Sequence, residues 1–571
     1  MGVRTFEYKI DNGDTAWMMV CTTFIFLMAP ALGFFYAGLA RAKNALSLMY
    51  LTVLSVAVVS IQWYLIGFSL TFSATGGPFI GDSVHFLLRS VGVQPHLESQ
   101  TIPQSVFMIF QAMFACITPG LAFGSAAERM SLGPAILFIF VWTTCVYDII
   151  TYWVWGPNGW LNVMGVLDFA GGTPVHISSG LAAVAYAMVL GKRRDYHENV
   201  NTPHNVSFVF LGLALLWFGW FCFNAGSALG ANAQSVHALI CTHLSACVAA
   251  VVWVLMDYRH ARKWSIIGLC TGAVAGLATI TPGSGYVSYS SSLAFGALGS
   301  FVCNLAVQYK HKYGFDDALD VFAVHYIGGL VGLVLTGIFA QRNVMALAFP
   351  EGTDISSVRI GGWLDGNWMQ VPYQLAAIAS VSAYSFVVTY IILIVLNMFP
   401  FLRLRLADED ELIGTDWAEM GERAYAYLPM EQTQPVEPRD SSASSIEDAA
   451  TVGSNGVRPN KTLDRIKRLL RADNRRLVVK GVPDLVEDPV VLDFNQQKDL
   501  GGIRLSEITH NATGGDLFQK TPAQVRQEQQ EAESVDLQDL PMQVVIPDQG
   551  PSAQVSLHHR PQPKDKHKEV V

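Results

Sequence analysis

The stretch VHISSGL at 175–181 returns later in the chain as VHYIGGL at 324–330, and this pair decides the fold. Each copy lies inside an apolar block long enough to cross a bilayer, for which about 20 residues are needed. Each copy also carries one histidine, His176 or His325, among apolar residues and glycine. The two stretches therefore predict two related membrane-spanning helices with one ionisable side chain each.

Two further matches extend the repeat outward from the histidines. FYAG at 35–38 matches FNAG at 223–226, and ITPG occurs both at 117–120 and at 280–283. Together the matches pair the first, third and fifth apolar blocks with the sixth, eighth and tenth, in order. A five-helix unit repeated in tandem must have its second copy upside down. This predicts the inverted-repeat architecture of transport proteins, whose pathway lies between the repeats.

The whole succession of apolar blocks excludes a soluble protein. The chain is 51% hydrophobic and only 15% charged, where soluble proteins carry nearer a quarter of charged residues. We predict an all-α integral membrane protein with two inverted five-helix repeats and one extra helix. The eleven expected spans are 16–38, 47–72, 105–127, 132–155, 170–191, 206–229, 235–257, 264–282, 289–309, 318–341 and 373–401.

Basic residues in alternate loops set the orientation. The basic loops contain Arg41 and Lys43, Arg129, the triplet 192–194, the cluster 259–263, Lys310 and Lys312, and Arg403 and Arg405. The other loops carry almost no basic charge, with Arg89, Arg342 and Arg359 as the exceptions. Because basic loops stay in the cytoplasm, we expect the N-terminus outside and the C-terminus inside.

The composition changes after residue 402, which predicts three parts: a membrane domain at 1–402, a cytoplasmic segment at 403–427 and a largely disordered tail at 428–571. Beyond 402 the chain has 21 Lys and Arg against 29 Asp and Glu, so nearly all of its net charge of −9 lies there. The stretch 462–480 alternates basic and aliphatic residues, and it either binds an anionic membrane surface or partner groove or is a solvated charged helix. The cluster 441–445 offers serines to a kinase.

The histidine pair suggests a pathway through the membrane. Ionisable groups inside spans usually mark such pathways, although a single histidine can also be a packing residue. A neutral imidazole can donate or accept a hydrogen bond and titrates near neutral pH, whereas a permanent charge would trap or repel a cation. We expect the pseudo-twofold axis to bring His176 and His325 together near the midplane.

Ordered motifs along the chain resemble the ammonium transporter, methylammonium permease and Rhesus family over about 14–425, and most closely its fungal ammonium permease branch. The motifs are FACIT at 114–118, AER at 127–129, DFAGGT at 168–173 followed by His176, WF at 220–221 with FNAGS at 223–227, and DVF at 320–322 with VH at 324–325. GTD at 414–416 and MGE at 420–422 resemble the regulatory segment of that family. The resemblance implies ammonium uptake by a multi-pass plasma membrane protein, a homotrimer in contact with membrane lipid.

The resemblance also assigns an outer ammonium site. Trp155 corresponds to the recruiting tryptophan, whose ring face attracts a cation. Ser227 corresponds to the residue that accepts a hydrogen bond from ammonium, and Phe114 contributes to the same site. Phe114 and Phe223 correspond to a stacked gate beneath it. The resemblance then implies that ammonium is deprotonated and passes as ammonia along His176 and His325.

Two aspartates near span ends are interpreted as structural or electrostatic. Asp168 precedes the fifth span and is expected to cap it while it biases the outer mouth toward cations. Asp320 lies toward the cytoplasmic end of the tenth span, where it is either a cap or part of a proton exit route. Both alternatives for Asp320 stay open from the sequence.

Other classes of function find little support in the sequence. It shows no nucleophile–base set, metal cluster or phosphate-binding loop, so we expect no enzyme, catalytic residue, cofactor or metal site, and no basic footprint for nucleic acid. The eight cysteines all fall in apolar blocks without a CxxC pair, as small core residues do. Two rivals remain, a Rhesus-type neutral channel without net charge movement and an ammonium sensor that signals through its tail.

Overall fold

The computed structural model describes residues 9–95, 101–194, 196, 203–312, 314–350, 352–425, 477–479 and 490–492. The chain divides into two compact units, Met1–Glu437 and Pro438–Val571. In the second unit, β1 (Leu477–Val479) pairs antiparallel with β2 (Val490–Leu492). The serine cluster 441–445 and most of the basic stretch 462–480 lie outside the described residues.

The first unit is a helical bundle in which all eleven predicted segments are helical. Several spans contain one π-helical turn. The helices are α1 (Asn12–Leu39), α2 (Ala45–Gln62) running through a π turn (Trp63–Gly67) into α3 (Phe68–Phe72), α4 (Gln104–Ala126), α5 (Leu132–Trp142) running through a π turn (Thr143–Tyr147) into α6 (Asp148–Trp155), α7 (Trp160–Met164), a π turn (Gly172–Ile177) leading into α8 (Ser178–Leu190), α9 (Val206–Gly226), α10 (Ala233–Ala261), α11 (Ile266–Ile280), α12 (Tyr289–Tyr309), a π turn (Phe322–Tyr326) leading into α13 (Ile327–Phe339), α14 (Arg342–Met345), α15 (Gln370–Asn397) and α16 (Asp408–Ile413).

Ten helical segments in the described part of the chain are long and apolar enough to cross a membrane. α11 is apolar but shorter, with 15 residues. The prediction of an all-α membrane bundle is thus confirmed for this unit. The count of eleven crossings and the outward N-terminus stay predictions.

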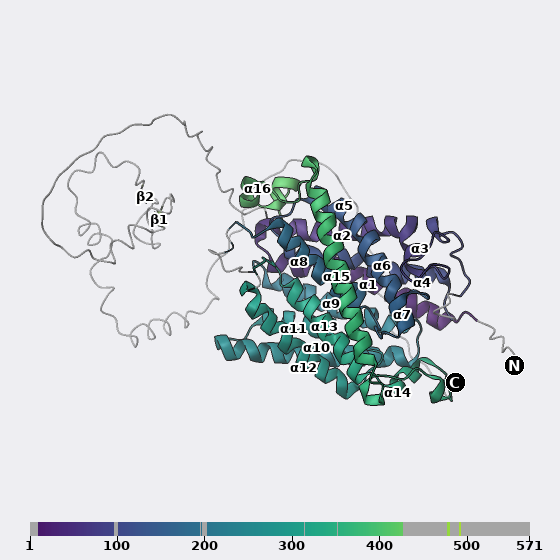
Figure 1. Ribbon diagram of the computed structural model, residues 1–571. Coiled ribbons are helices and arrows are strands. Elements are labelled where there is room, and N and C mark those ends of the chain that lie inside the picture. The colour runs from purple at the N-terminus through teal and green to yellow at the C-terminus, as the bar shows by residue number, and fades with distance from the viewer. Residues whose placement is uncertain are drawn as a thin grey trace, which may run out of the picture. The chain divides into compact units, whose positions relative to one another are not determined.

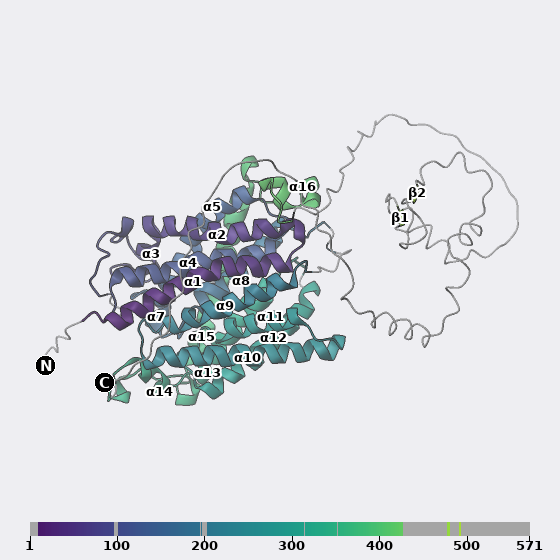
Figure 2. The ribbon, with the colours of Figure 1, turned by 180° about the vertical axis from the view of Figure 1, so that it is seen from behind.

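α1 packs along α9, and small residues let the two backbones approach closely (Figure 2). Gly212 and Gly219 of α9 face α1, and Gly226 lies against both α1 and α4. A Cβ atom added at Gly212 would lie 2.5 Å from the backbone nitrogen of Phe35, and one at Gly219 would lie 2.3 Å from Met28. Since apolar lipid gives helices no hydrophobic reason to associate, this close van der Waals packing holds the two helices together.

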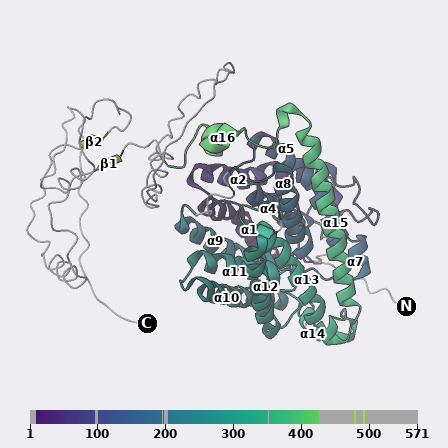
Figure 3. The same ribbon diagram turned by 60° about the vertical axis from the view of Figure 1, so that its left-hand side comes forward.

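The segment 403–425 folds onto the same unit. α16 lies at one end of the bundle and α14 at the opposite end (Figures 1 and 3). Beyond α16, the Asp416 carboxylate accepts hydrogen bonds from the backbone N–H groups of Leu46 (2.9 Å) and Ser47 (2.8 Å). These groups belong to the first turn of α2, whose donors have no partner inside the helix. Asp416 therefore caps a membrane span that lies far from it in the sequence.

Candidate functional site

The structure places the two histidines in direct contact. His176 and His325 each lie in a π turn at the start of a span, and each is almost fully buried, with 1% and 4% of its surface exposed. Their Nδ1 atoms are 3.3 Å apart, and the ring planes are inclined by 26°. In such a contact one Nδ1 donates and the other accepts, so two neutral rings must have different tautomers.

A cavity opens beside the histidines. Its walls come from α1, α4, α9 and α11 together with the two histidine turns, and most of its lining residues are apolar. Of the lining residues, only Asp320 carries a charge. The cavity next to the imidazoles therefore has a mostly apolar wall with few polar groups.

Aromatic rings continue from the histidines toward the other end. Phe223 lies 6.4 Å from His176 between ring centres, and Phe114 lies 4.1 Å from Phe223. Trp155 stands perpendicular to Phe114 at 5.9 Å. Both phenylalanines are almost fully buried, and Phe223 also lines the cavity. The structure thus brings together Trp155, Phe114, Phe223 and His176, which the sequence had placed in separate helices.

Ser227 and Trp155 are held by the backbone near this row of rings. The Ser227 hydroxyl donates to the carbonyl oxygen of Phe223 (2.9 Å). Its proton is thereby used, and its oxygen lone pairs remain to accept from a donor such as an N–H group. The Trp155 Nε1–H donates to the carbonyl oxygen of Asp168 (2.9 Å), which fixes the indole ring.

Asp168 is buried and caps the turn that carries His176. Its carboxylate accepts from the backbone N–H groups of Gly171 (2.9 Å), Gly172 (2.7 Å) and Thr173 (2.6 Å), and from the Thr173 hydroxyl (2.5 Å). Gly171 adopts a left-handed conformation with φ 113°, which a glycine reaches at little cost. The capping part of the expectation matches these contacts, and the bias of the outer mouth toward cations stays a prediction.

The residue equivalent to Asp168 in the second half is Asp317, which the sequence analysis did not select. His325 follows His176 by 149 residues, and the same offset leads from Asp168 to Asp317. Asp317 Oδ2 accepts from the backbone N–H of Phe322 (2.7 Å) at the start of the second histidine turn. The constant offset between the repeats is the signal that could have found it.

Asp320 has a different role from Asp317. Its carboxylate pairs with the Lys310 ammonium at 2.6 Å, and it lines the cavity. Capping, one of the two alternatives for Asp320, is therefore carried out by Asp317. Burial, helped by the nearby charge of Asp320, raises the pKa of the Asp317 carboxyl from 3.8 to about 6. The other alternative, that Asp320 is part of a proton exit route, stays a prediction.

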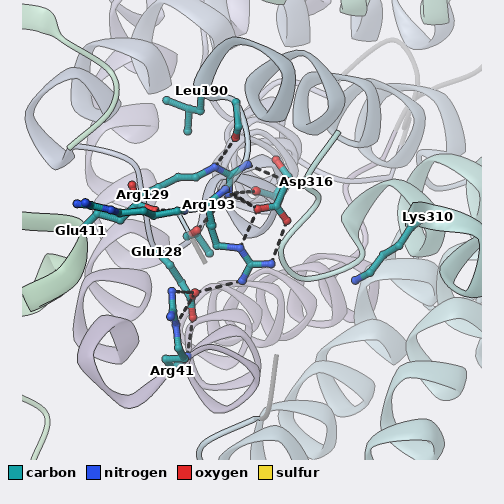
Figure 4. A network of polar contacts seen from close by, with 12 residues as sticks. Arg41, Glu128, Arg129, Leu190, Arg193, Lys310, Asp316 and Glu411 are labelled. Carbon is teal, nitrogen blue, oxygen red and sulfur yellow. Dashed lines mark hydrogen bonds and ion pairs between the residues drawn. The ribbon is translucent and has the colours of Figure 1, made fainter. Parts of the chain in front are cut away.

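Charged side chains from the ends of several helices form a cluster of ion pairs (Figure 4). We call this cluster the ionic rim, and its members are Arg41, Glu128, Arg129, Arg193 and Asp316. Arg193 donates to both oxygens of Asp316 (2.8 and 2.9 Å) and to Glu128 (3.1 Å). Arg41 pairs with Glu128 at 2.6 Å, and Arg129 donates to the backbone oxygen of Asp316.

The rim charges compensate one another. Burial alone would raise the pKa of the Glu128 and Asp316 carboxyls, but the adjacent arginines lower both. Burial lowers the pKa of Arg129 to about 10, against the opposing effect of Asp316. In the sequence, Glu128 and Arg129 belong to the AER motif, and the arginines indicate the orientation. Nothing in the sequence predicts that these residues contact one another.

Facing imidazoles beneath a row of aromatic rings, inside a bundle of apolar spans, define a membrane transport protein. The family model described as Ammonium Transporter Family matches residues 16–425. Ammonium transporter 1 of Schizosaccharomyces pombe is 48% identical over 417 residues, covering 73% of this chain and 83% of the relative. Ammonium transporter MEP2 of Saccharomyces cerevisiae is 41% identical over 432 residues, covering 74% and 86%.

A solved structure agrees with these relatives. The crystal structure of Candida albicans Mep2 matches with a TM-score of 0.66 at 40% identity, covering 72% of this chain and 90% of that one. The chain therefore belongs to the Ammonium Transporter Family, in its fungal branch. The expectation of a transporter and not an enzyme is confirmed by this membership.

Proposed function

We propose that this chain takes up ammonium, which is captured outside the aromatic gate, deprotonated, and passed as ammonia along His176 and His325. The observation that carries the proposal is the contact of two buried imidazoles, 3.3 Å apart, in a cavity with a single charged lining residue. Taking an intact cation out of water into such surroundings costs far more than taking a neutral molecule. The neutral species is thus the one that suits this lumen.

The outer site would recognise what distinguishes ammonium from potassium, its N–H donors. The Ser227 oxygen has lone pairs free for such a donor, and the Trp155 ring face attracts the cation. Phe114 lies between this site and Phe223, so passage requires the two phenyl rings to separate. Ring movement of this kind would let one molecule pass while excluding a file of hydrated ions.

The proton released at capture would cross by way of the histidines. The contact between the two Nδ1 atoms gives a proton one direct hydrogen bond from one half of the bundle to the other. Net charge then accompanies transport. The rival is a neutral channel of the Rhesus type, in which the proton stays outside.

Ammonium-dependent current in reconstituted vesicles tests this proposal. We expect ammonium to evoke an inward current. Ammonia that enters the vesicle raises the internal pH, and we expect the incoming proton to offset part of this rise. Uptake of labelled methylammonium without current would instead establish the neutral channel. Absence of both uptake and current in correctly folded protein would overturn the transport function itself.

We further propose that the protein is a homotrimer in the plasma membrane, with one pore in each subunit and a tail that regulates it. This extends the resemblance, and a sensing role in addition to uptake belongs to the same proposal. A monomeric mass in mild detergent would contradict the trimer. Truncation after Tyr427 should leave folding intact and alter the response to nitrogen supply or to a kinase, and an unchanged response would contradict the regulatory role.

A further inference from the structure

A second buried acid lies within the spans, away from the cavity. Asp148 is the first residue of α6 and has no exposed surface. The Gln62 amide nitrogen donates to Asp148 Oδ2 (2.6 Å) and to the Thr144 hydroxyl (3.1 Å). None of these residues lines the cavity beside the histidines. The carboxyl group of Asp148 is thus buried inside the membrane bundle without contributing to the cavity beside the histidines.

Several polar atoms near Asp148 lack an outside partner among the described residues. Asp148 Oδ1 and Gln62 Oε1 have no hydrogen-bond partner there, and the hydroxyls of Tyr147 and Thr151 have no partner except each other. Each unsatisfied buried group costs about 1–3 kcal/mol. Polar atoms of this kind on neighbouring helices can hold a buried water molecule, which bonds to two to four polar partners.

The charge on Asp148 has nothing to balance it. No described Lys, Arg or His forms an ion pair with it, and the titratable groups that face it are the tyrosine Tyr147 and the thiols of Cys145 and, beyond Tyr147, Cys116. By contrast, Asp168 receives four hydrogen bonds. An isolated buried carboxylate is very costly, and such a group is neutral instead. Asp148 is therefore expected to hold its proton.

The backbone is adapted to this place. One π turn, Trp63–Gly67, follows Gln62 directly, and another, Thr143–Tyr147, ends just before Asp148. π turns occur frequently at functional sites. Gly67 leaves the room that the Gln62 amide occupies, because a Cβ atom there would lie 2.5 Å from Gln62 Oε1. Two spans thus carry the same irregularity on either side of one polar contact.

We propose that Asp148, Gln62, Tyr147 and Thr151 form a site that binds water and one proton inside the membrane, separate from the ammonium path. α4 lies between the two, because Cys116 contacts Ser60 of α2 (3.6 Å) while the next residue, Ile117, lines the cavity. This inference does not depend on what the pore transports. The alternative occupant is a monovalent cation bound to an ionised Asp148.

Infrared spectroscopy of the purified full chain in vesicles tests the proton. At pH 8, where Asp317 is ionised, the parent should show a carboxylic-acid C=O band that Asp148→Asn lacks. Thr143→Val is the matched control, since the Thr143 hydroxyl is buried in the same π turn and bonds only to Ile139. Its spectrum should keep the band. Identical spectra for the parent and Asp148→Asn would overturn the proposal, as would a carboxylate band that depends on sodium or potassium concentration.

The water is tested separately, with a variant that keeps the acid. Thr151→Val removes one partner of the proposed water and should shift the frequency of the Asp148 band without abolishing it. High-resolution electron density should show water within hydrogen-bond distance of Asp148 Oδ1. An unshifted band together with an empty site would overturn the proposal that water binds there. This test remains valid if Asp148→Asn does not fold.

Discussion

Beside the cavity, His176 and His325 lie buried side by side without an ion pair to any described residue, whereas in the ionic rim Arg193 lies between two carboxylates, those of Glu128 and Asp316. Both regions bury ionisable groups. The cavity does so with two imidazoles whose Nδ1 atoms are 3.3 Å apart. The rim does so with paired charges, which hold loops from distant parts of the chain in one place.

Burial of an ionisable group alone therefore does not indicate function. A buried charge is tolerated when it is paired, and removing one partner is then far more damaging than the pair itself is stabilising. A neutral polar group in an apolar wall gives less structural support but can exchange a proton. We therefore expect variants of the ionic rim to change stability and variants of the two histidines to change the transport rate.

The largest effect is expected at Arg193. Arg193→Gln leaves Asp316 without its main partner and Glu128 with only one arginine, which should cost about 3–5 kcal/mol of unfolding free energy. Thermal unfolding in detergent, followed by size-exclusion chromatography, measures the loss. Arg194→Gln is the matched control, because Arg194 is half exposed and its pair with exposed Asp408 spans 3.8 Å. Its cost should stay below about 1 kcal/mol. Equal losses in both variants would contradict the structural role of the rim.

The next effect depends on pH and arises at Asp317. Because its folded-state pKa of about 6 lies above its ordinary value of 3.8, the stability that its proton contributes is complete below about pH 4 and is lost as the pH rises through 6. Asp317→Asn keeps the cap and cannot ionise. It should therefore be more stable than the parent above pH 6, by up to about 3 kcal/mol, and equal to it below pH 4. Melting curves between pH 4 and 8 that run parallel would rule this out.

In the pore, His325→Ala should leave the Nδ1 atom of His176 without a partner. An unmet buried polar group costs about 1–3 kcal/mol, which is roughly 10- to 100-fold in rate if it falls on the barrier. Ammonium current at equal surface abundance is the measurement, and His243→Ala, an exposed histidine of α10, is the control. Parent-like current in His325→Ala would make the histidines packing residues.

A carboxylate in place of the first histidine should change selectivity. His176→Glu puts a group that can hold an intact cation where a neutral ring stood, so currents should become larger and less selective for ammonium over potassium. Currents in both salts, recorded in the same vesicles, decide the outcome. A selectivity equal to that of the parent would show that the neutrality of the ring does not matter.

The smallest effect is expected at Ser227. Ser227→Ala removes one proposed acceptor for ammonium, and a typical hydrogen bond contributes about 0.5–1.5 kcal/mol. The ammonium concentration at half-maximal current should rise about two- to tenfold, with little change in the maximal current. A fall in maximal current at unchanged half-saturation would place Ser227 in the gate and not in the capture site.

Long apolar blocks made the helices predictable, and the repeated histidine motif made the contact between His176 and His325 predictable. The second cap, Asp317, was missed although the offset of 149 residues between the histidines also leads from Asp168 to it. Contacts between distant loops were also hidden, since Arg193 lies 65 residues from Glu128 and 123 from Asp316. Gln62 and Asp148 each stand alone in an apolar block, so only the folded chain reveals their bond.

The cap that Asp416 places on α2 has a consequence for how the protein is made. The bond to Ser47 joins residues 369 positions apart, so the first turn of the second span enters the bilayer long before its partner leaves the ribosome. Water or the insertion machinery must occupy those amide groups in the meantime. Asp416 thus completes the assembly of one of the first helices to be inserted. A nascent chain that stops before Asp416 would present that open helix end to quality control.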